Sequence, residues 1–448
     1  MYILSLLYNG YSYYLLYMKS YKILVSSVDP WSEKVGSDTL TSLLSQFDSS
    51  QIASLNIRAK QSDSHVAARY FHIIEDRVIK SIIYADISTG EEYTVSEQVT
   101  IPEVLDYEKE RNRYSKNYRI SRWILVIIRE LLWKCGRWKS KELDAFVESF
   151  NPDVLFFPIE SYIHFNRINN YIIKKYQPKR VIGYMWDDNF TFKQHPFNLL
   201  YYLHRAWLRK SVKELIRNCS VVFAITPKLK RELDSAYGID SILLTKPLRK
   251  TEMHELSSIG NPIKLLYTGK LNIGRDKTLA AIVDAIRVVN HEKQKVILDV
   301  YTNSSFSEKI KSRIDVPGCC NIHDFIPQSE VLEKQKHADV LLFIEALSKN
   351  DLSARLSFST KITDYFSAGK CIWAVGNSNL APIDYLQEEG AAFVSNSKQE
   401  ILTKLQEIVN SPEKVVYCAQ KAYECGKRNH DSELINMRFR NAICESYR

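Results

Sequence analysis

The chain lacks several features that would assign it to other classes of protein. Its eight cysteines include no pair at the spacing of zinc ligands, and the adjacent Cys319 and Cys320 do not form a CxxC motif. We therefore expect reduced thiols in a cytosolic protein rather than a disulfide framework. The sequence also contains no solenoid repeat, no low-complexity tract and no recognised nucleic-acid-binding module.

The N-terminal segment lacks charge. Residues 1–17 contain six tyrosines and no charged side chain. They have neither the basic start nor the small-residue cleavage site of a signal peptide, and they are short and tyrosine-rich for a membrane span. Two interpretations remain for an extension over residues 1–18: translation begins at Met18, or the segment anchors the protein at a membrane surface.

The composition is that of a soluble globular protein of more than one domain. The 448 residues have a mass of 52.1 kDa, and 45% are hydrophobic and 25% charged. A chain of this length predicts two domains. The net charge of +9 favours anionic partners such as nucleic acid, phosphates or an acidic membrane surface.

Strands alternate with helices along the chain. Residues 22–27 form an apolar strand pattern, residues 29–38 a loop with Gly36, and residues 39–47 a helical pattern, which together open a doubly wound domain. A second alternating unit begins at residue 263. The predicted fold class is α/β with two Rossmann-like domains. We expect a first domain over residues 19–246, a linker over 247–262, a second domain over 263–425 and a returning C-terminal helix over 426–448.

One predicted helix differs from the others. Residues 119–141 have apolar side chains at helical spacing, seven basic residues and one acidic residue. Trp123, Trp133 and Trp138 add aromatic side chains of the kind found at membrane interfaces. Such a helix fits an anionic bilayer surface. The alternative is a core-facing helix with a solvated basic rim.

The segment from Ser357 to Lys370 predicts a phosphate and ribose site. Ser359 and Thr360 stand at the start of a predicted helix, Lys361 lies in its first turn, and Asp364 follows three residues later. A helix start has unpaired N–H groups and partial positive charge, which suit a phosphate. Asp364 can accept hydrogen bonds from a sugar diol. The alternative is a capped helix with a surface lysine.

Three further segments of the second domain favour a nucleotide site. Gly269 opens a loop whose basic residues can neutralise a diphosphate, and the alternative is a solvated basic loop. The loop around Phe325 can read a base edge through its backbone. Glu345 ends a strand at the sheet edge where ligands bind, unless it forms a buried pair with Arg355. The basic residues of the first loop are Lys270, Arg275 and Lys277.

These motifs resemble the nucleotide-sugar-binding domain of retaining glycosyltransferases of the GT-B fold, family 4. The resemblance covers residues 263–425 and implies two Rossmann-like domains that face a central cleft. It implies diphosphate contacts from Gly269, Lys270 and either Arg275 or Lys277. It further implies phosphate contacts from the helix start at residues 359–361 and a ribose contact from Asp364.

The sequence departs from the family pattern at two places. The first of two family glutamates is replaced by Leu356, and Glu345 is a substitute from a nearby strand. In the first domain, Trp186 stands near the place of a family histidine. There we expect Gly36, with Ser37, to approach the diphosphate.

The expected catalytic residues are Glu345 and three acceptor-side residues of the first domain, His164, Asp187 and Asp188. Structural alternatives are a locally satisfied helix histidine and capping or turn-forming aspartates. Asp187 and Asp188 do not form a D-x-D metal motif, and the fold class usually needs no metal.

The resemblance implies a metal-independent hexosyl transfer with retention, from a nucleoside-diphosphate sugar and without another cofactor. We expect a glycan or lipid-linked acceptor in bacterial polysaccharide or glycoconjugate assembly, and no nucleic-acid partner. The expected location is the cytoplasm, with peripheral contact at the inner membrane face. Two alternatives remain: a nucleotide-sugar epimerase of the same fold, or a catalytically silent glycan- or nucleotide-binding subunit.

Overall fold

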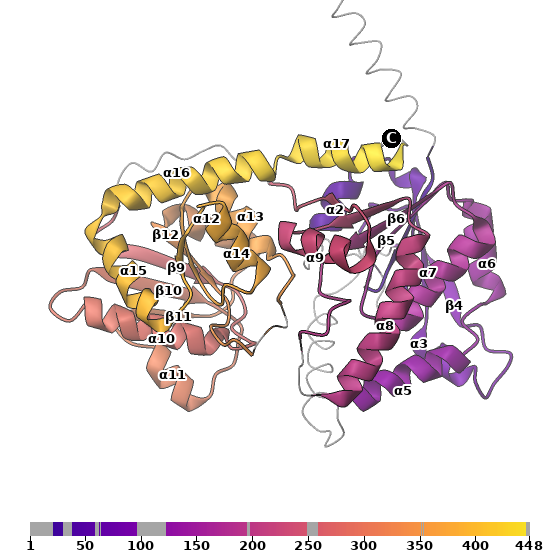
Figure 1. The fold of residues 1–448 in the computed structure, drawn as a ribbon, viewed down its shortest axis with the longest axis horizontal. Helices are drawn as coiled ribbons and strands as arrows, with labels where there is room; N and C mark the ends of the chain where they lie inside the picture. Colours follow the sequence, from indigo (N-terminus) through magenta and orange to yellow (C-terminus); the bar gives the residue numbers. More distant parts are fainter. Residues whose placement is uncertain are drawn as a thin grey trace, which may run out of the picture.

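The computed structural model shows two α/β domains side by side, spanned by the last two helices (Figure 1). It describes residues 21–29, 38–58, 62, 64–95, 122–194, 198–248, 259–350, 352 and 354–444. The N-terminal extension, Gly36, Ser37 and most of the expected linker lie outside the described residues. The predicted fold class is confirmed.

The described part of the first domain is built on an eight-stranded sheet of order β4-β3-β2-β1-β5-β6-β7-β8. The strands are parallel except for β4, which runs antiparallel to β3. Most strand residues are buried, which explains their continuous apolar sequences. The strands are β1 (Ile23–Ser27), β2 (Ile52–Asn56), β3 (Arg69–Ile73), β4 (Gly90–Tyr93), β5 (Val154–Pro158), β6 (Arg180–Met185), β7 (Val221–Ala224) and β8 (Ile242–Leu243).

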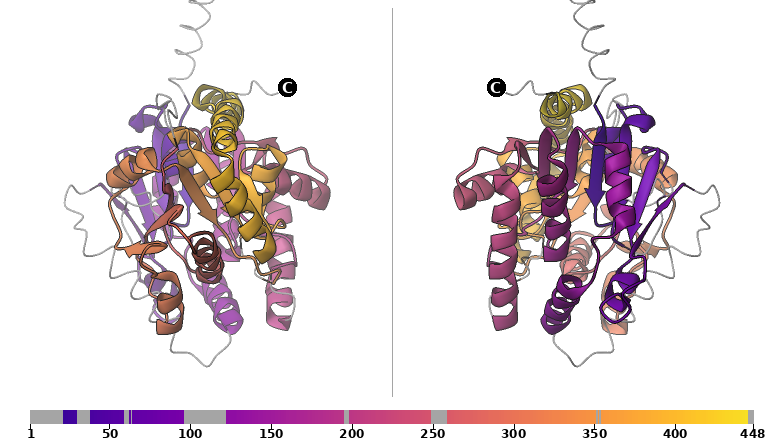
Figure 2. Two further views of the ribbon diagram at one scale, coloured as in Figure 1. Left: turned by 90° about the vertical axis from the view of Figure 1, so that its left-hand side faces the viewer. Right: turned by 90° about the vertical axis from the view of Figure 1, so that its right-hand side faces the viewer.

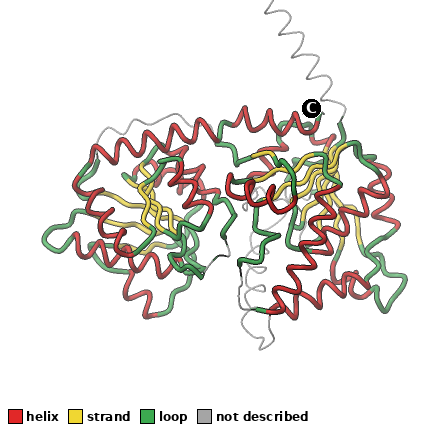
Figure 3. Tube along the Cα trace, in the orientation of Figure 1, coloured by secondary structure: helices red, strands yellow, loops and turns green. Residues whose placement is uncertain are grey.

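Helices cover this sheet, as the tube and side views also show (Figures 2 and 3). Several begin with side-chain caps: Ser140, Asn198 and Thr226 each accept a hydrogen bond from a backbone N–H in the first turn. The helices are α2 (Asp38–Leu44), α3 (Glu75–Lys80), α5 (Arg122–Cys135), α6 (Lys141–Phe150), α7 (Ile163–Tyr176), α8 (Leu199–Arg217) and α9 (Pro227–Tyr237), with a short 3-10 helix at Ser49–Gln51.

In the described residues, the second domain has a six-stranded parallel sheet of order β11-β10-β9-β12-β13-β14. Its strands are β9 (Ile263–Thr268), β10 (Val296–Tyr301), β11 (Cys320–His323), β12 (Val340–Ile344), β13 (Cys371–Val375) and β14 (Phe393–Ser395). Its helices are α10 (Arg275–Val289), α11 (Glu308–Ile314), α12 (Gln328–His337), α13 (Thr360–Ala368), α14 (Ala381–Glu388) and α15 (Lys398–Asn410).

The last two helices connect the domains. Helix α16 (Pro412–Asn429) packs on β13 and α13 of the second domain. Helix α17 (Ser432–Ile443) returns to the first domain, where Phe439 lies 5.0 Å from Phe156 and 6.1 Å from Phe223 between ring centroids. The last helix therefore completes the hydrophobic core of the first domain.

The basic helix predicted over residues 119–141 corresponds in its described part to α5, which ends at Cys135. Trp133 and Trp138 are buried, and Trp123 is half-buried against Tyr201. Trp133 and Trp138 are therefore core residues, and their assignment as interfacial aromatics is wrong. Among the helices of the described residues, none is both long and apolar enough to cross a membrane.

Candidate donor site at the interface of the two domains

The strand order of the second sheet marks its ligand-binding edge. Strand β9 pairs with β10 on one side and β12 on the other, so the chain direction along the sheet reverses between β9 and β12. Doubly wound sheets bind ligands at the carboxyl ends of the strands that flank this reversal. The loop from Gly269 to Gly274 follows β9, and Glu345 follows β12. Both sequence-predicted segments thus lie at the switch point.

Gly269 and Lys361 lie in direct contact at this edge. Gly269 has φ of +130°, and a Cβ atom added there would lie 2.1 Å from Nζ of Lys361. Lys361 reaches the loop from the first turn of α13 and passes over Tyr267, with Nζ 4.6 Å from the ring centroid. A side chain at this position would be strained at this φ and would displace the ammonium group from the loop backbone.

The electrostatics of Lys361 favour an anionic ligand. Burial lowers the pKa of Lys361 to about 8, and the nearby charge of Arg275 acts in the same direction. The carboxylates of Glu345 and Asp364 act against this shift but do not outweigh it. A phosphate beside Nζ would stabilise the charged form that burial disfavours.

Arg275 and Glu345 form a bidentate ion pair. The guanidinium donates from Nη2 to Oε1 at 2.8 Å and from Nε to Oε2 at 3.0 Å, and Glu345 is 5% exposed. The sequence alternative that paired Glu345 with Arg355 is wrong, because Arg355 binds elsewhere. Glu345 instead holds Arg275 at the start of α10, beside Lys361.

Asp364 of the α13 segment lies next to a lysine of the first domain. Nζ of Lys246, at the end of the first domain, lies 3.8 Å from Oδ1 of Asp364, and both side chains are largely buried. Ser359 occupies the N-cap position of α13 without a side-chain capping bond, and Thr360 is exposed. Lys246 is a site residue that no sequence pattern indicated.

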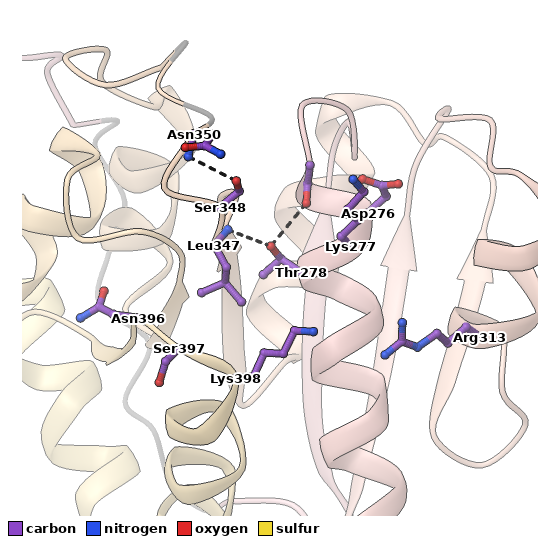
Figure 4. Close-up of a pocket in the computed structure, with 11 residues that line it drawn as sticks. Asp276, Lys277, Thr278, Arg313, Leu347, Ser348, Asn350, Asn396, Ser397 and Lys398 are labelled. Atoms are coloured by element: carbon purple, nitrogen blue, oxygen red, sulfur yellow. Dashed lines mark hydrogen bonds between the residues drawn. The ribbon is translucent and has the colours of Figure 1, made fainter. Parts of the chain in front are cut away.

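Lys277 and Arg275 point to different places although they are two residues apart. Lys277 lines a cavity of about 780 Å³ on the side of α10 that faces α15 (Figure 4). Arg313 and Lys398 contribute further positive charge to this cavity. Of the two basic residues left open by the sequence, Arg275 is the one beside Lys361. Lys270 is exposed in the loop from Gly269 to Gly274.

The loop after β11 presents an aromatic side chain. Phe325 is 66% exposed at the carboxyl edge of the sheet. Before it, His323 stacks on Tyr301 with centroids 4.5 Å apart, and its Nε2 lies 2.9 Å from Oδ1 of Asp299. Phe325 therefore offers an exposed ring on which a base can stack.

The expected catalytic aspartates take part in contacts between the domains. Ser357 donates a hydrogen bond to Asp187. Arg355 donates from Nη2 to Asp188 Oδ2 at 3.0 Å and to Glu232 Oε2 at 2.8 Å. Asp188 is buried and also accepts a hydrogen bond from the backbone of its own turn. Asp188 thus has a structural role in holding the two domains together, whereas Asp187 lies at the edge of the site.

A carboxyl group that sequence reasoning missed lies near Asp187. Glu160 follows β5, which pairs with β1 at the switch point of the first sheet. Burial raises the pKa of Glu160 to about 8, and the charges of Asp187 and Asp29 add to the effect. Burial likewise raises the pKa of Asp187, although the hydrogen bond from Ser357 opposes this shift. Its position directly after a predicted strand was the signal that could have identified Glu160.

His164 does not lie in the site. Its side chain is fully buried, stacks on Trp133 at 4.4 Å between centroids, and has Nδ1 3.0 Å from Oε1 of Glu130. Burial lowers the pKa of His164 despite the neighbouring carboxylate. Glu130 also accepts hydrogen bonds from the backbone N–H groups of Ile163 and His164. The acceptor-side assignment of His164 is not supported, because the imidazole belongs to the core.

No group of three or more potential metal ligands of the His, Cys, Asp or Glu type occurs among the described residues. No family model matches the chain, and no curated protein matches it in sequence.

Several solved structures share the fold. HepE from Anabaena, in complex with UDP, has a TM-score of 0.60 at 10% identity and covers 95% of this chain and 100% of its own. The α,α-trehalose 6-phosphate synthase of Burkholderia multivorans has a TM-score of 0.58 at 10% identity, and the match covers 95% of this chain and 99% of the synthase. The UDP-forming α,α-trehalose-phosphate synthase of Burkholderia vietnamiensis has a TM-score of 0.57 at 10% identity, and the match covers 95% of this chain and 100% of the synthase. The chain therefore has the GT-B fold, and the predicted resemblance is confirmed at the level of the fold.

Proposed function

We propose that the chain is a glycosyltransferase that moves a sugar from a nucleoside-diphosphate sugar to an acceptor hydroxyl with retention. The observation that carries this proposal is the meeting of Lys361, Arg275 and Gly269 at the switch point of the second sheet. A uridine diphosphate is the first nucleotide to test, because HepE was solved with UDP and with UDP-glucose.

The residues have distinct roles in this proposal. Lys361 and the start of α13 stabilise the negative charge that develops on the diphosphate as the sugar–oxygen bond breaks. Arg275, held by Glu345, adds a second cation. Gly269 lets the backbone approach the diphosphate, Asp364 binds the ribose, and Phe325 stacks on the base. No metal ion is required for this charge stabilisation.

The acceptor side is assigned to the first domain. Glu160 and Asp187 are two carboxyl groups whose pKa values are both raised by burial at the edge that faces the second domain. With a pKa of about 8, Glu160 can remain protonated at neutral pH and donate a hydrogen bond to an acceptor or sugar hydroxyl. With retention, the acceptor proton passes to the departing phosphate, and the new bond forms on the face that the phosphate leaves.

The proposed setting is bacterial polysaccharide or glycoconjugate assembly, in the cytoplasm and at the inner face of the membrane. The net charge of +9 supports anionic donors and an anionic surface. A glycan or lipid-linked acceptor fits this setting.

Nucleotide binding and turnover test the proposal. We expect UDP, and not CDP, GDP or ADP, to raise the melting temperature of the wild type. Lys361→Met and Asp364→Asn should lose this response, and exposed Lys264→Met on β9 is the matched control. Release of UDP from UDP-glucose or another UDP-sugar should increase when an acceptor glycan is added, and the sugar should appear on that glycan.

Two results would lead to the alternatives. Interconversion of UDP-sugars without an acceptor would identify an epimerase. Selective UDP binding without turnover of any donor or acceptor would identify a silent binding subunit. A melting temperature that no nucleotide changes would overturn the donor site itself.

A further inference from the structure

The exposed large apolar side chains are concentrated on one edge of the first domain. Of the sixteen among the described residues, nine lie on α5, on the first turns of α8 and in the turn after α3. A grouped apolar surface on a folded protein marks an interaction site. We call this group the apolar edge: Ile82, Ile83, Tyr84, Ile124, Leu125, Ile128, Leu131, Leu199 and Leu203.

Helix α5 has two apolar faces, and the protein buries only one of them. Trp133 and Glu130 face α7, where Glu130 accepts the N–H groups that begin that helix. On the other face, Ile124, Leu125, Ile128 and Leu131 are 39–47% exposed. Their spacing of i, i+1, i+4 and i+7 forms a continuous stripe. A helix that supplied only a core-facing surface would have polar residues at these positions.

The three parts of the apolar edge lie side by side. Arg129 of α5 donates to Glu75 of α3 at 2.7 Å, and the ring of Trp123 lies 5.1 Å from Tyr201 of α8. Figures 1 and 2 show α3, α5 and the start of α8 together at the lower edge of the first domain. Helices α16 and α17 run along the opposite side of the molecule.

Exposed basic side chains that have no carboxylate partner among the described residues lie next to the apolar edge. Lys134, Arg137 and Lys139 are exposed in and directly after α5, and within the described part of the chain none has a carboxylate partner. By contrast, Arg129 and Lys80 on the same edge are paired with Glu75 and Asp76. We call these three cations the basic rim: the backbone N–H of Arg137 donates to Ser81, next to Ile82 of the apolar edge, and Lys139 lies over the rings of Trp138 and Tyr171.

We propose that the apolar edge and its basic rim dock the protein on a bilayer with anionic phospholipid headgroups. The aliphatic stripe of α5 enters the interface, and Lys134, Arg137 and Lys139 meet the headgroup phosphates. A second copy of the chain fits less well, because a two-fold contact through this edge would bring the two basic rims toward each other. This surface gives the peripheral membrane contact of the proposed function a defined location.

Vesicle binding tests the proposal without a sugar donor. The full chain is mixed with vesicles of phosphatidylcholine alone or with an equal amount of phosphatidylglycerol, and bound protein is measured by sedimentation. We expect binding to the mixed vesicles only, and weaker binding as salt rises. The double variant Ile128→Ser, Leu131→Ser should bind at least about tenfold more weakly. The matched control is Val288→Ser, which removes an apolar side chain 57% exposed on α10.

UDP binding of each variant separates this proposal from the proposed function. A double variant that still binds UDP but no longer binds vesicles supports the docking surface. Loss of UDP binding with vesicle binding retained would bear on the donor site and not on the docking surface. The docking proposal is overturned by equal binding to neutral vesicles, or by equal vesicle binding of wild type and double variant. A dimer in light scattering that the double variant dissociates would assign the edge to a second copy of the chain and also overturn it.

Discussion

Nζ of Lys361 occupies the space that a side chain at Gly269 would need, 2.1 Å from the ideal Cβ position. Gly269→Ala should therefore displace this ammonium group and weaken UDP binding at least about tenfold, since a hydrogen bond to a charged group contributes about 1.5–3 kcal/mol. Isothermal titration calorimetry measures the change. Gly238→Ala is the control, because Gly238 also has positive φ but no atom within 4 Å of its Cβ position.

The affinity for UDP should fall as pH rises through about 8. Burial lowers the pKa of Lys361 to about 8 in the free protein, so the ammonium loses its proton above that value. A bound diphosphate favours the charged form, and binding above pH 8 must then take up a proton. Titrations across this pH range should show the fall in the wild type and a flat profile in Lys361→Met. An unchanged wild-type affinity would separate Lys361 from the phosphate.

Arg355→Met should destabilise the protein strongly. The substitution leaves Asp188 buried without its cation, and breaking such a pair costs about 3–5 kcal/mol. Urea denaturation measures the free energy of unfolding. Arg313→Met breaks the exposed pair with Asp284 and should cost no more than about 1 kcal/mol. Equal effects of the two variants would contradict the role of Arg355 as a contact between the domains.

Glu160→Gln should slow sugar transfer while leaving UDP binding intact. Glu160 lies at the edge of the first sheet, on the proposed acceptor side, and general acid–base groups contribute about 10²–10⁴-fold to rate. The values of kcat and of the Kd for UDP, measured on one preparation, test this separation. Glu214→Gln, an exposed carboxyl on α8, is the control.

His430 should make the protein sensitive to acid. Burial lowers the pKa of His430 to about 4, although the carbonyl of Lys246 opposes the shift. The unfolded chain binds this proton near pH 6.5, so the unfolded state gains protons first as pH falls. Stability should decline between about pH 6.5 and 4, by up to about 3 kcal/mol from this residue. His430→Gln should flatten the decline, whereas exposed His291→Gln should not.

The fold could be predicted because local patterns determine it. Alternation of apolar strands and amphipathic helices indicates parallel sheets, and the glycine loop after residue 268 marks the switch point. The place of Leu356 could not be predicted, because this residue of the second domain is buried in the core of the first. That packing depends on how two domains meet, which a local pattern does not record.

The candidate site could likewise be predicted where it depends on local motifs and not where it depends on packing between distant segments. Gly269, Arg275 and Lys361 belong to local motifs, and the structure brings them together. Their roles, like those of Lys270, Lys277, Phe325, Ser359, Thr360 and Asp364, stay predictions until ligands are tested. His164 resembled a site residue only because the sequence did not reveal that Glu130 and Trp133 enclose it.

The position of α17 has a consequence for synthesis of the chain on the ribosome. Phe439 is translated after all the strands of the second domain, yet it packs against Phe47, Phe156 and Phe223 in the first domain. The first domain must therefore wait, with an apolar groove uncovered, until the second domain has been made. A chain that ends at Asn429 should expose this groove to protease and to chaperones, even though every strand of both described sheets is present.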